Sequence, residues 1–354
     1  MNGELERLLA LLDRTLDCER QLRIHGLHVR ALSYDSVERL PLILEVPLPP
    51  ECPFRPFRYR EAFDDPDKML FNELVSAFGV SILAHDRIGD DLPYTIRANC
   101  GTVIVASIFG GRVELIDDNP PWVRPFGDAD TLRRACDCDP LDFGRGLCPK
   151  ILDIYHRYHE ALAGFPNVKR SVKLVLPDLQ GPFDTVELLR GSEIFVDLYE
   201  QPDWVREMLT MAAGAQVGFA RHLQPLLTDS EPGFAHQHGT AMRGNILIRG
   251  DSSVNVSADM YRQQIAEHDE CVMRSLDGGG IHFCGNGQHL IPSMMELPSL
   301  RCIDFGQPEM NDLDAIYAQA STRRIPLIRV RVAEEELVSG RVLVLCLPRI
   351  DGLK

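Results

Sequence analysis

The chain lacks the features of a nucleic-acid-binding protein or a membrane protein. Its 37 basic residues are outnumbered by 52 acidic ones, and the formal net charge is −15. Such a charge argues against a nucleic-acid partner, which would need a basic surface. No apolar run reaches membrane-spanning length, and Glu4 and Glu6 stand where a signal peptide would be basic. These absences predict a cytoplasmic protein with no membrane partner.

A disulfide framework is also missing. The ten cysteines are scattered at positions 18, 52, 100, 136, 138, 148, 271, 284, 302 and 346, without the spacing of such a framework. Several lie in apolar runs, where a free cysteine packs like a small hydrophobic residue, and this usage is typical of a reducing compartment. Because the sequence has no internal repeat, low-complexity tract or flexible linker, we expect residues 1–354 to form one domain.

Short apolar runs rich in Val, Ile and Leu recur along the chain. They are residues 41–46, 80–85, 172–178, 245–251, 279–284, 301–305, 325–332 and 341–347. The runs lack a clean polar–apolar alternation, as buried parallel strands do, and helical patterns separate them. Eight such strands with intervening helices predict an α/β protein of the (β/α)8 TIM-barrel type.

Two segments fall outside this pattern. Residues 3–20 have leucines at helical spacing, so we expect residues 1–40 to form a helical extension. More than eighty residues separate the second predicted strand from the third. Within them we expect a hairpin over 101–117, with Gly110 and Gly111 at its turn, and a helix near 146–162. A connection of this length often covers an active site, so residues 86–171 are predicted to form a lid-like insertion.

His282 and Cys284 are the leading candidates for chemistry. They are two positions apart on a predicted strand, so their side chains point to the same face. An imidazole and a thiolate suit a zinc ion, and Cys346 near the end of the last predicted strand would supply a second thiolate. The three would form an open-sided metal site. In the simpler alternative, His282 and Cys284 only pack in the core.

Other polar residues follow the carboxyl ends of the predicted strands, where chemistry collects in barrels of this type. Candidates for contact with substrate are Asp86, Asp178, Gln180, Asn286 and Gln307. Candidates for a catalytic or ligand-orienting role are Asp251, Glu309 and His238. An aspartate after a strand often only caps the next helix, and this alternative applies to Asp251.

Several motifs together resemble the uroporphyrinogen decarboxylase superfamily. They are residues 177–183, 188–191, 197–199 with Pro202, 244–253, 257–261 and 282–286. The resemblance runs from about Leu40 to the C-terminus, and the fold that it implies is a (β/α)8 barrel.

The residues favour one branch of that superfamily. Decarboxylases resemble one another in an arginine-containing stretch after the first strand, whereas residues 44–50 of this chain contain no arginine. Zinc-dependent corrinoid methyltransferases carry His-x-Cys on one strand and a later Cys near the end of the last. His282, Cys284 and Cys346 match this pattern in order, although Leu347 and Pro348 follow Cys346 where the family usually has glycine.

The resemblance implies a methyltransferase that moves a methyl group between a corrinoid (cobalamin) and a thiol or pterin acceptor, with one zinc ion per chain. A separate corrinoid protein would be the partner, because this chain has no Asp-x-His-x-x-Gly motif. Two alternatives stay open. One is a metal-free uroporphyrinogen decarboxylase-like lyase, and the other is a non-catalytic barrel that binds a corrinoid or tetrapyrrole.

Overall fold

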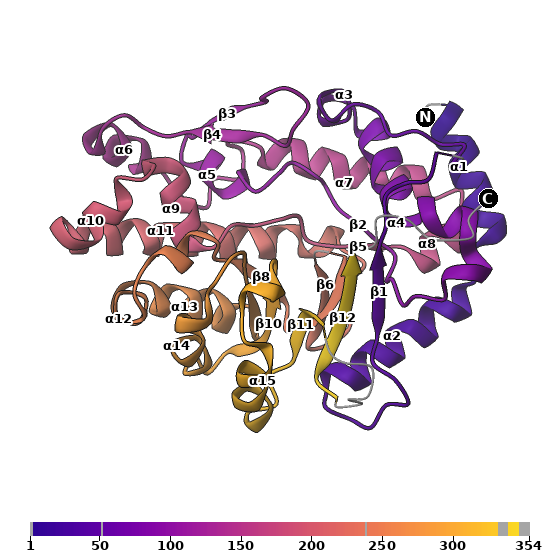
Figure 1. The fold of residues 1–354 in the computed structure, drawn as a ribbon. Coiled ribbons are helices and arrows are strands. Elements are labelled where there is room, and N and C mark those ends of the chain that lie inside the picture. Colours follow the sequence, from indigo (N-terminus) through magenta and orange to yellow (C-terminus); the bar gives the residue numbers. More distant parts are fainter. Residues whose placement is uncertain (1–2, 51, 238, 332–338, 347–354) are drawn as a thin grey trace.

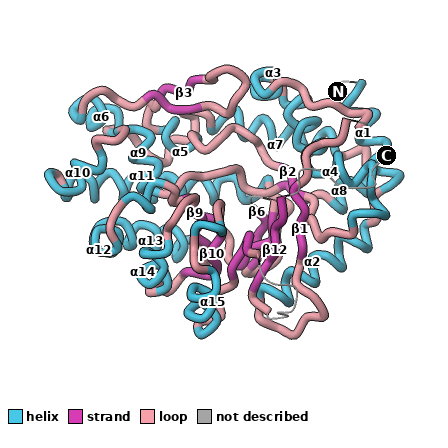
Figure 2. The backbone as a smooth tube through the Cα atoms, viewed as in Figure 1, coloured by secondary structure: helices cyan, strands magenta, loops and turns pink. Residues whose placement is uncertain are grey.

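The computed structural model describes the chain apart from residues 1–2, 51, 238, 332–338 and 347–354, and it gives no side-chain description for 79–88. It is a mixed α/β structure with a central sheet of six parallel strands. In spatial order these are β1 (Leu42–Glu45), β12 (Arg341–Cys346), β11 (Leu327–Val330), β10 (Leu300–Phe305), β9 (Gly279–Phe283) and β8 (Ile246–Arg249). Helices lie around these strands (Figures 1 and 2).

A second pair of parallel strands lies next to this sheet. It consists of β2 (Thr95–Ile96) and β5 (Lys173–Leu174). A parallel bridge joins Gln180, after β5, to Arg249 at the end of β8. On the other side, the amide of Asp91 donates to the carbonyl of Leu42 in β1 at 2.7 Å. The arrangement is compatible with the predicted TIM-barrel-like fold.

The prediction of a strand at residues 80–85 is wrong, because these residues lie in α4 (Pro66–Ile88). Asp65 caps this helix by accepting from the amides of Asp67 and Lys68, and Gly89 ends it in the left-handed conformation. A short apolar run is compatible with either a buried strand or a buried helix, so its hydrophobicity alone misassigns it. The parallel strand in this part of the chain is β2.

The hairpin expected over 101–117 is displaced toward the C-terminus. Residues at its start form α5 (Ile104–Ile108), and Gly110, with a φ of 79°, follows the end of this helix. The antiparallel pair is β3 (Arg112–Glu114) with β4 (Trp122–Arg124). Gly110 therefore follows a helix, a common role for a residue that tolerates positive φ, and is not part of the turn of a hairpin.

The N-terminal helical pattern is divided between α1 (Gly3–Thr15) and α2 (Cys18–Leu32). Asp17 separates them, because its side chain accepts from the amide of Arg20 at 2.9 Å and caps α2. The remaining helices before β5 are α3 (Tyr59–Asp64), α6 (Ala129–Cys136), α7 (Cys148–Leu162) and α8 (Pro166–Ser171). The helix predicted near 146–162 is thus confirmed as α7.

The chain after β5 is largely helical. Its helices are α9 (Pro182–Arg190), α10 (Ile194–Glu200), α11 (Pro202–Leu223), η1 (Gln224–Leu226), η2 (Ser252–Asn255), α12 (Ala258–Met260), the π-helix η3 (Tyr261–Ile265), α13 (Ala266–Ser275), η4 (Gln288–Leu290), α14 (Ile291–Met295), η5 (Pro308–Met310) and α15 (Leu313–Thr322). An antiparallel hairpin of β6 (Phe234–Gln237) and β7 (Thr240–Arg243) precedes β8. Proline occupies the first turn of α9 and α11, where its missing N–H costs nothing.

Two apolar clusters occupy opposite faces of the central sheet. The larger one lies between the sheet and the helices, and it includes Ile281, Phe283, Ile303 and Phe305. The smaller one fills what we call the inner face of the sheet. Its buried members are Leu32, Ile43, Ala241, Met242, Leu247, Cys302, Ile328, Val342 and Val344. Successive side chains of a strand point to opposite faces, which explains why Cys302 and Ile303 belong to different clusters.

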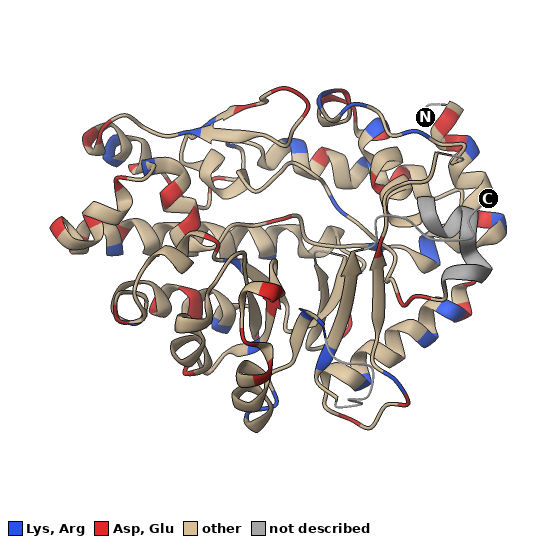
Figure 3. Ribbon diagram, viewed as in Figure 1, with Lys and Arg blue, Asp and Glu red and all other residues tan. Residues whose placement is uncertain are grey.

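Basic and acidic residues are mixed along the outer helices (Figure 3). Within the described part of the chain, none of the helices combines the length and the apolar character that crossing a bilayer requires.

The hydroxyl of Tyr155 links the two short strands of the outlying pair. It donates to the carbonyl of Val175 and accepts from the amide of Ala98 at 3.3 Å. Because Tyr155 is buried, we expect Tyr155→Phe to lower the free energy of unfolding by about 1–3 kcal/mol. Urea denaturation would measure this change.

Tyr199→Phe is the matched control, because Tyr199 is 73% exposed and the change should stay within about 0.5 kcal/mol. Equal midpoints for the two variants would contradict the role assigned to Tyr155.

Candidate functional site

A polar layer lies directly above the apolar cluster of the inner face. Two residues beyond Leu247 comes Arg249, and two beyond Cys302 comes Asp304. Strand pairing then places these residues side by side, since His282 is in register with Arg249 on β8 and with Asp304 on β10. All three are at most 5% exposed. The strands therefore bring charged side chains together where only the neighbouring polar groups can stabilise them.

His282, Cys284 and Asp251 form a compact group of potential metal ligands among the described residues. One ligand atom from each lies within 4.8 Å of the others. His282 Nε2 is 3.7 Å from Cys284 Sγ and 3.8 Å from Asp251 Oδ1. The other ring nitrogen of His282, Nδ1, is 2.7 Å from Asp304 Oδ2. An ionised carboxylate can only accept, so the bond to Asp304 keeps the proton on Nδ1 and leaves Nε2 unprotonated, as a metal-binding nitrogen must be.

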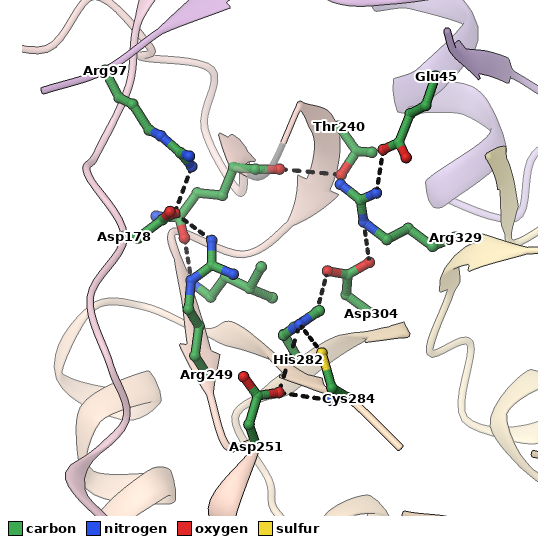
Figure 4. A network of polar contacts seen from close by, with 12 residues as sticks. Glu45, Arg97, Asp178, Thr240, Arg249, Asp251, His282, Cys284, Asp304 and Arg329 are labelled. Atoms are coloured by element: carbon green, nitrogen blue, oxygen red, sulfur yellow. Dashed lines mark hydrogen bonds and ion pairs between the residues drawn. The ribbon is translucent and has the colours of Figure 1, made fainter. Parts of the chain in front are cut away.

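Arg329 connects this group to Cys346. Its Nε lies 3.3 Å from Asp304 Oδ1, and its Nη1 donates to Glu45 Oε1 at 2.6 Å. The other carboxylate oxygen of Glu45 accepts from Cys346 Sγ at 3.1 Å. Figure 4 shows the line of contacts from Glu45 through Arg329 and Asp304 to His282 and Cys284. Cys346 thus contacts the site through the side chain of Glu45.

The inward direction of Arg329 depends on a distortion of β11. The register between β11 and β12 shifts between Ile328 and Val330, and Arg329 has a φ of 62°. In a regular strand, Arg329 would share the face of Leu327, which packs in the larger apolar cluster. A bulge at this point lets Ile328 and Arg329 both face inward. A left-handed arginine costs free energy, and its two carboxylate partners offset that cost.

A second ion-pair group lies on the opposite side of the polar layer. Asp178 Oδ1 accepts from Arg97 Nη1 at 2.6 Å and also from Arg249 Nη2 (Figure 4). Arg97 comes from the segment after β2, and Arg249 ends β8. Asp178, which the sequence predicts to contact substrate, is therefore already held by two guanidiniums. Gln180 is buried beside it and pairs with the backbone of Arg249.

A cavity of about 530 Å³ opens above this layer. His282, Cys284 and Arg329 line one part of its wall, and Glu73, Arg97 and Asn99 line another. Glu73 accepts from the amide of Arg97 and from Asn99 Nδ2, and burial raises the pKa of its carboxyl group. The volume is that of a small-molecule site.

The other predicted site residues lie away from the cavity wall or outside the described residues. Asp86 falls in helix α4 and does not follow a strand, so its predicted place at a strand end is wrong. His238 lies outside the described residues. Asn286, Gln307 and Glu309 are exposed and are not among the described residues that line the cavity. Their predicted contacts with substrate or catalytic roles remain predictions.

Sequence reasoning missed most of the charged residues around His282. Arg249, Asp304 and Arg329 each interrupt an apolar run that the sequence correctly predicts to be a strand. A charged residue inside a buried strand is a signal for a partner or a function, and it was available from the sequence. No comparable signal marks Arg97, because the short strand before it is not predicted by the pattern of apolar runs.

Comparison with known proteins gives a likeness at the level of fold. No protein-family model matches the chain, and no curated protein matches it in sequence. A solved methyltransferase from Methanosarcina mazei is similar in structure, with a TM-score of 0.61 and 17% sequence identity. The match covers 84% of this chain and 80% of that one. At this identity the likeness concerns the fold, and the resemblance to the uroporphyrinogen decarboxylase superfamily rests on the motifs alone.

The thiol of Cys284 should react slowly when no metal is bound. Burial, and next the carboxylate of Asp251, raise its pKa to about 11. Because the thiolate is the reactive form, we expect alkylation of Cys284 by iodoacetamide to rise about tenfold per pH unit from pH 8 toward pH 11. Peptide mass spectrometry of chelator-treated protein would follow this one cysteine.

The control is the chain in denaturant, where cysteines titrate near about 8.5. The same rate for Cys284 in the folded and the unfolded chain at pH 8 would contradict the assigned pKa.

The sulfur of Cys284 fits beside Gly306 because glycine has no side chain. A Cβ at this position would lie 2.4 Å from Cys284 Sγ and 3.3 Å from His282 Cε1. Gly306→Ala should therefore lower the free energy of unfolding by about 1–3 kcal/mol through overpacking. Gly26→Ala on α2 is the control, because its Cβ meets nothing within 4 Å and the change should stabilise the helix by about 0.5–1 kcal/mol. Denaturant midpoints that move in the same direction in both variants would contradict the close contact at Gly306.

Proposed function

We propose that this protein is a zinc-dependent methyltransferase that moves a methyl group between a corrinoid protein and a thiol or pterin acceptor. The observation that carries the proposal is the His282–Cys284 pair, with Nε2 and Sγ 3.7 Å apart on the wall of a cavity. The methyltransferase-like fold supports the general type of reaction. The motif of residues 244–253 supports the superfamily, and the His-x-Cys pattern of His282 and Cys284 supports its corrinoid-linked branch.

The donor atoms fit the geometry of zinc. Bonds of about 2.0 Å to nitrogen and about 2.3 Å to sulfur in a tetrahedral site separate these two atoms by about 3.6 Å. The observed 3.7 Å between His282 Nε2 and Cys284 Sγ is close to this value. Asp304 supports the fit, because a metal-binding histidine usually donates its other N–H to a carboxylate.

The charges around the site also favour a divalent cation. The carboxylates and guanidiniums of the network belong to Glu45, Asp178, Asp251 and Asp304, and to Arg97, Arg249 and Arg329. The carboxylates exceed the guanidiniums by one, so the group has one surplus negative charge when all are ionised. A dication bound with the Cys284 thiolate would add one positive charge and balance it.

Residues of the chain itself would orient the metal ligands and make room for the acceptor. Asp304 holds the imidazole of His282 in one orientation, and Arg329 holds Asp304. The cavity admits a small acceptor next to Cys284, and apolar residues elsewhere on its wall, such as Leu92 and Val175, help to exclude water. When bound, zinc would favour the thiolate form of an acceptor thiol and so supply a nucleophile for methyl transfer.

The corrinoid would come from a partner protein. The cavity has the volume of a small-molecule site, which suits an acceptor such as a coenzyme thiol, and the chain lacks the Asp-x-His-x-x-Gly motif. The decarboxylase-like alternative has less support. It needs cations for substrate carboxylates, and Arg97 and Arg329 on the cavity wall are already engaged by Asp178, Glu45 and Asp304.

Metal content tests the proposal directly. Protein purified without chelator should contain about one zinc ion per chain, and Cys284→Ala should abolish it because a zinc site of this type needs the thiolate. Cys271→Ala on α13 is the control, since Cys271 is also a free cysteine but does not line the cavity. Folded wild-type protein without zinc, and unable to take it up, would end the proposal.

A further inference from the structure

The potential ligands nearest to one another do not include the second cysteine. Among the described residues, Asp251, His282 and Cys284 are the group whose ligand atoms lie within 4.8 Å of one another, and Cys346 is not a member. The motif resemblance implied two thiolates, from Cys284 and Cys346. The geometry instead brings one nitrogen, one sulfur and one carboxylate oxygen together.

Hydrogen bonds to two neighbouring segments hold the loop that carries Asp251. The amide of Gly250 donates to the carbonyl of His282 at 2.8 Å, and the amide of Cys284 donates to Asp251 Oδ1 at 2.6 Å. On its other side, the amide of Ser252 donates to Asp184 Oδ1 in α9 at 2.9 Å. The loop after β8 is therefore tied to the His282–Cys284 segment, and the carboxylate of Asp251 is fixed next to both side chains.

Cys346 has a different set of contacts. It ends β12, which is separated from β9 by β10 and β11 in the sheet. Each step between neighbouring strands is about 4.8 Å. Its exposed Sγ donates to Glu45 Oε2 at 3.1 Å, and strand pairing puts the two residues in register. Arg329 holds the other oxygen of Glu45 at 2.6 Å, so this acceptor for Cys346 is itself fixed.

We infer that Asp251, and not Cys346, is the third protein ligand of the metal, which gives a His–Cys–Asp site. The inference rests on the proposed zinc site and identifies its ligands. In a tetrahedral zinc site, nitrogen and carboxylate oxygen are separated by about 3.4 Å, and His282 Nε2 lies 3.8 Å from Asp251 Oδ1. Asp251 is already one of the carboxylates that, together with the Cys284 thiolate, balance the charge of a dication, so Cys346 can keep the proton that it donates to Glu45. Cys346 stays bonded to Glu45, outside the metal shell.

Zinc affinity separates the two ligand sets. Asp251→Asn keeps an oxygen that can accept the amide of Cys284 but removes the anionic ligand. It should weaken zinc binding by about 100-fold or more, because loss of an outer partner alone costs about 10- to 100-fold. Cys346→Ser is the matched variant, and it should change the affinity less than about threefold. Competition with a chromophoric chelator measures both dissociation constants on the full chain.

The number of sulfur ligands can be read separately from a spectrum. Chelator-stripped protein reloaded with Co²⁺ shows a sulfur-to-cobalt charge-transfer band, whose intensity grows with the number of bound thiolates. We expect this band to be the same in wild type and in Cys346→Ser. Cys346 is exposed, so Cys346→Ser should fold normally. The comparison of its spectrum with that of the wild type is therefore valid even if Asp251→Asn folds poorly.

A band that falls by about half in Cys346→Ser, with zinc affinity unchanged in Asp251→Asn, would overturn the His–Cys–Asp site and leave the proposed function intact. Absence of any metal binding by folded wild-type protein would instead overturn both. An unchanged band in Cys346→Ser together with weakened zinc binding in Asp251→Asn would support the inference.

Discussion

The site depends on the registered pairing of β8, β9 and β10. Parallel pairing puts Arg249, His282 and Asp304 next to one another, and the two-residue period of a strand points all three to the inner face. The apolar cluster beneath them leaves no room for the charges to move away from one another. Because this apolar cluster is close-packed, the three polar residues form one network, in which the position of each side chain depends on its neighbours.

That network explains why a histidine can be buried here at 2% exposure without being merely packed. Its Nδ1 is satisfied by Asp304, and Asp304 is shared with Arg329, which also holds Glu45. The remaining ring nitrogen faces a thiol and a carboxylate. An arrangement that served only stability would not need this combination, because buried ion pairs are weak evidence for stability and apolar residues pack equally well.

Much of this architecture could be predicted from the sequence, and the exceptions have physical reasons. The six strands of the central sheet could be found because each is a buried apolar run that is too short for an independent helix. The prediction for residues 80–85 failed because their apolar pattern also suits a helix, and α4 begins at a cap, Asp65, that lies well before the run. That His282 and Cys284 lie on the same face of a strand could be predicted from their spacing alone. Their proximity to Asp251 was not, since it depends on the loop after β8 being tied back to β9.

The bulge at Arg329 has a consequence for how this protein can vary between relatives. Surface connections tolerate insertions and deletions, but β11 does not have that freedom at this point. Regular alternation through residues 327–330 would turn the guanidinium of Arg329 toward Leu327 and the apolar helix-facing side. The bulge in this short strand is therefore needed for Arg329 to contact Asp304 and Glu45.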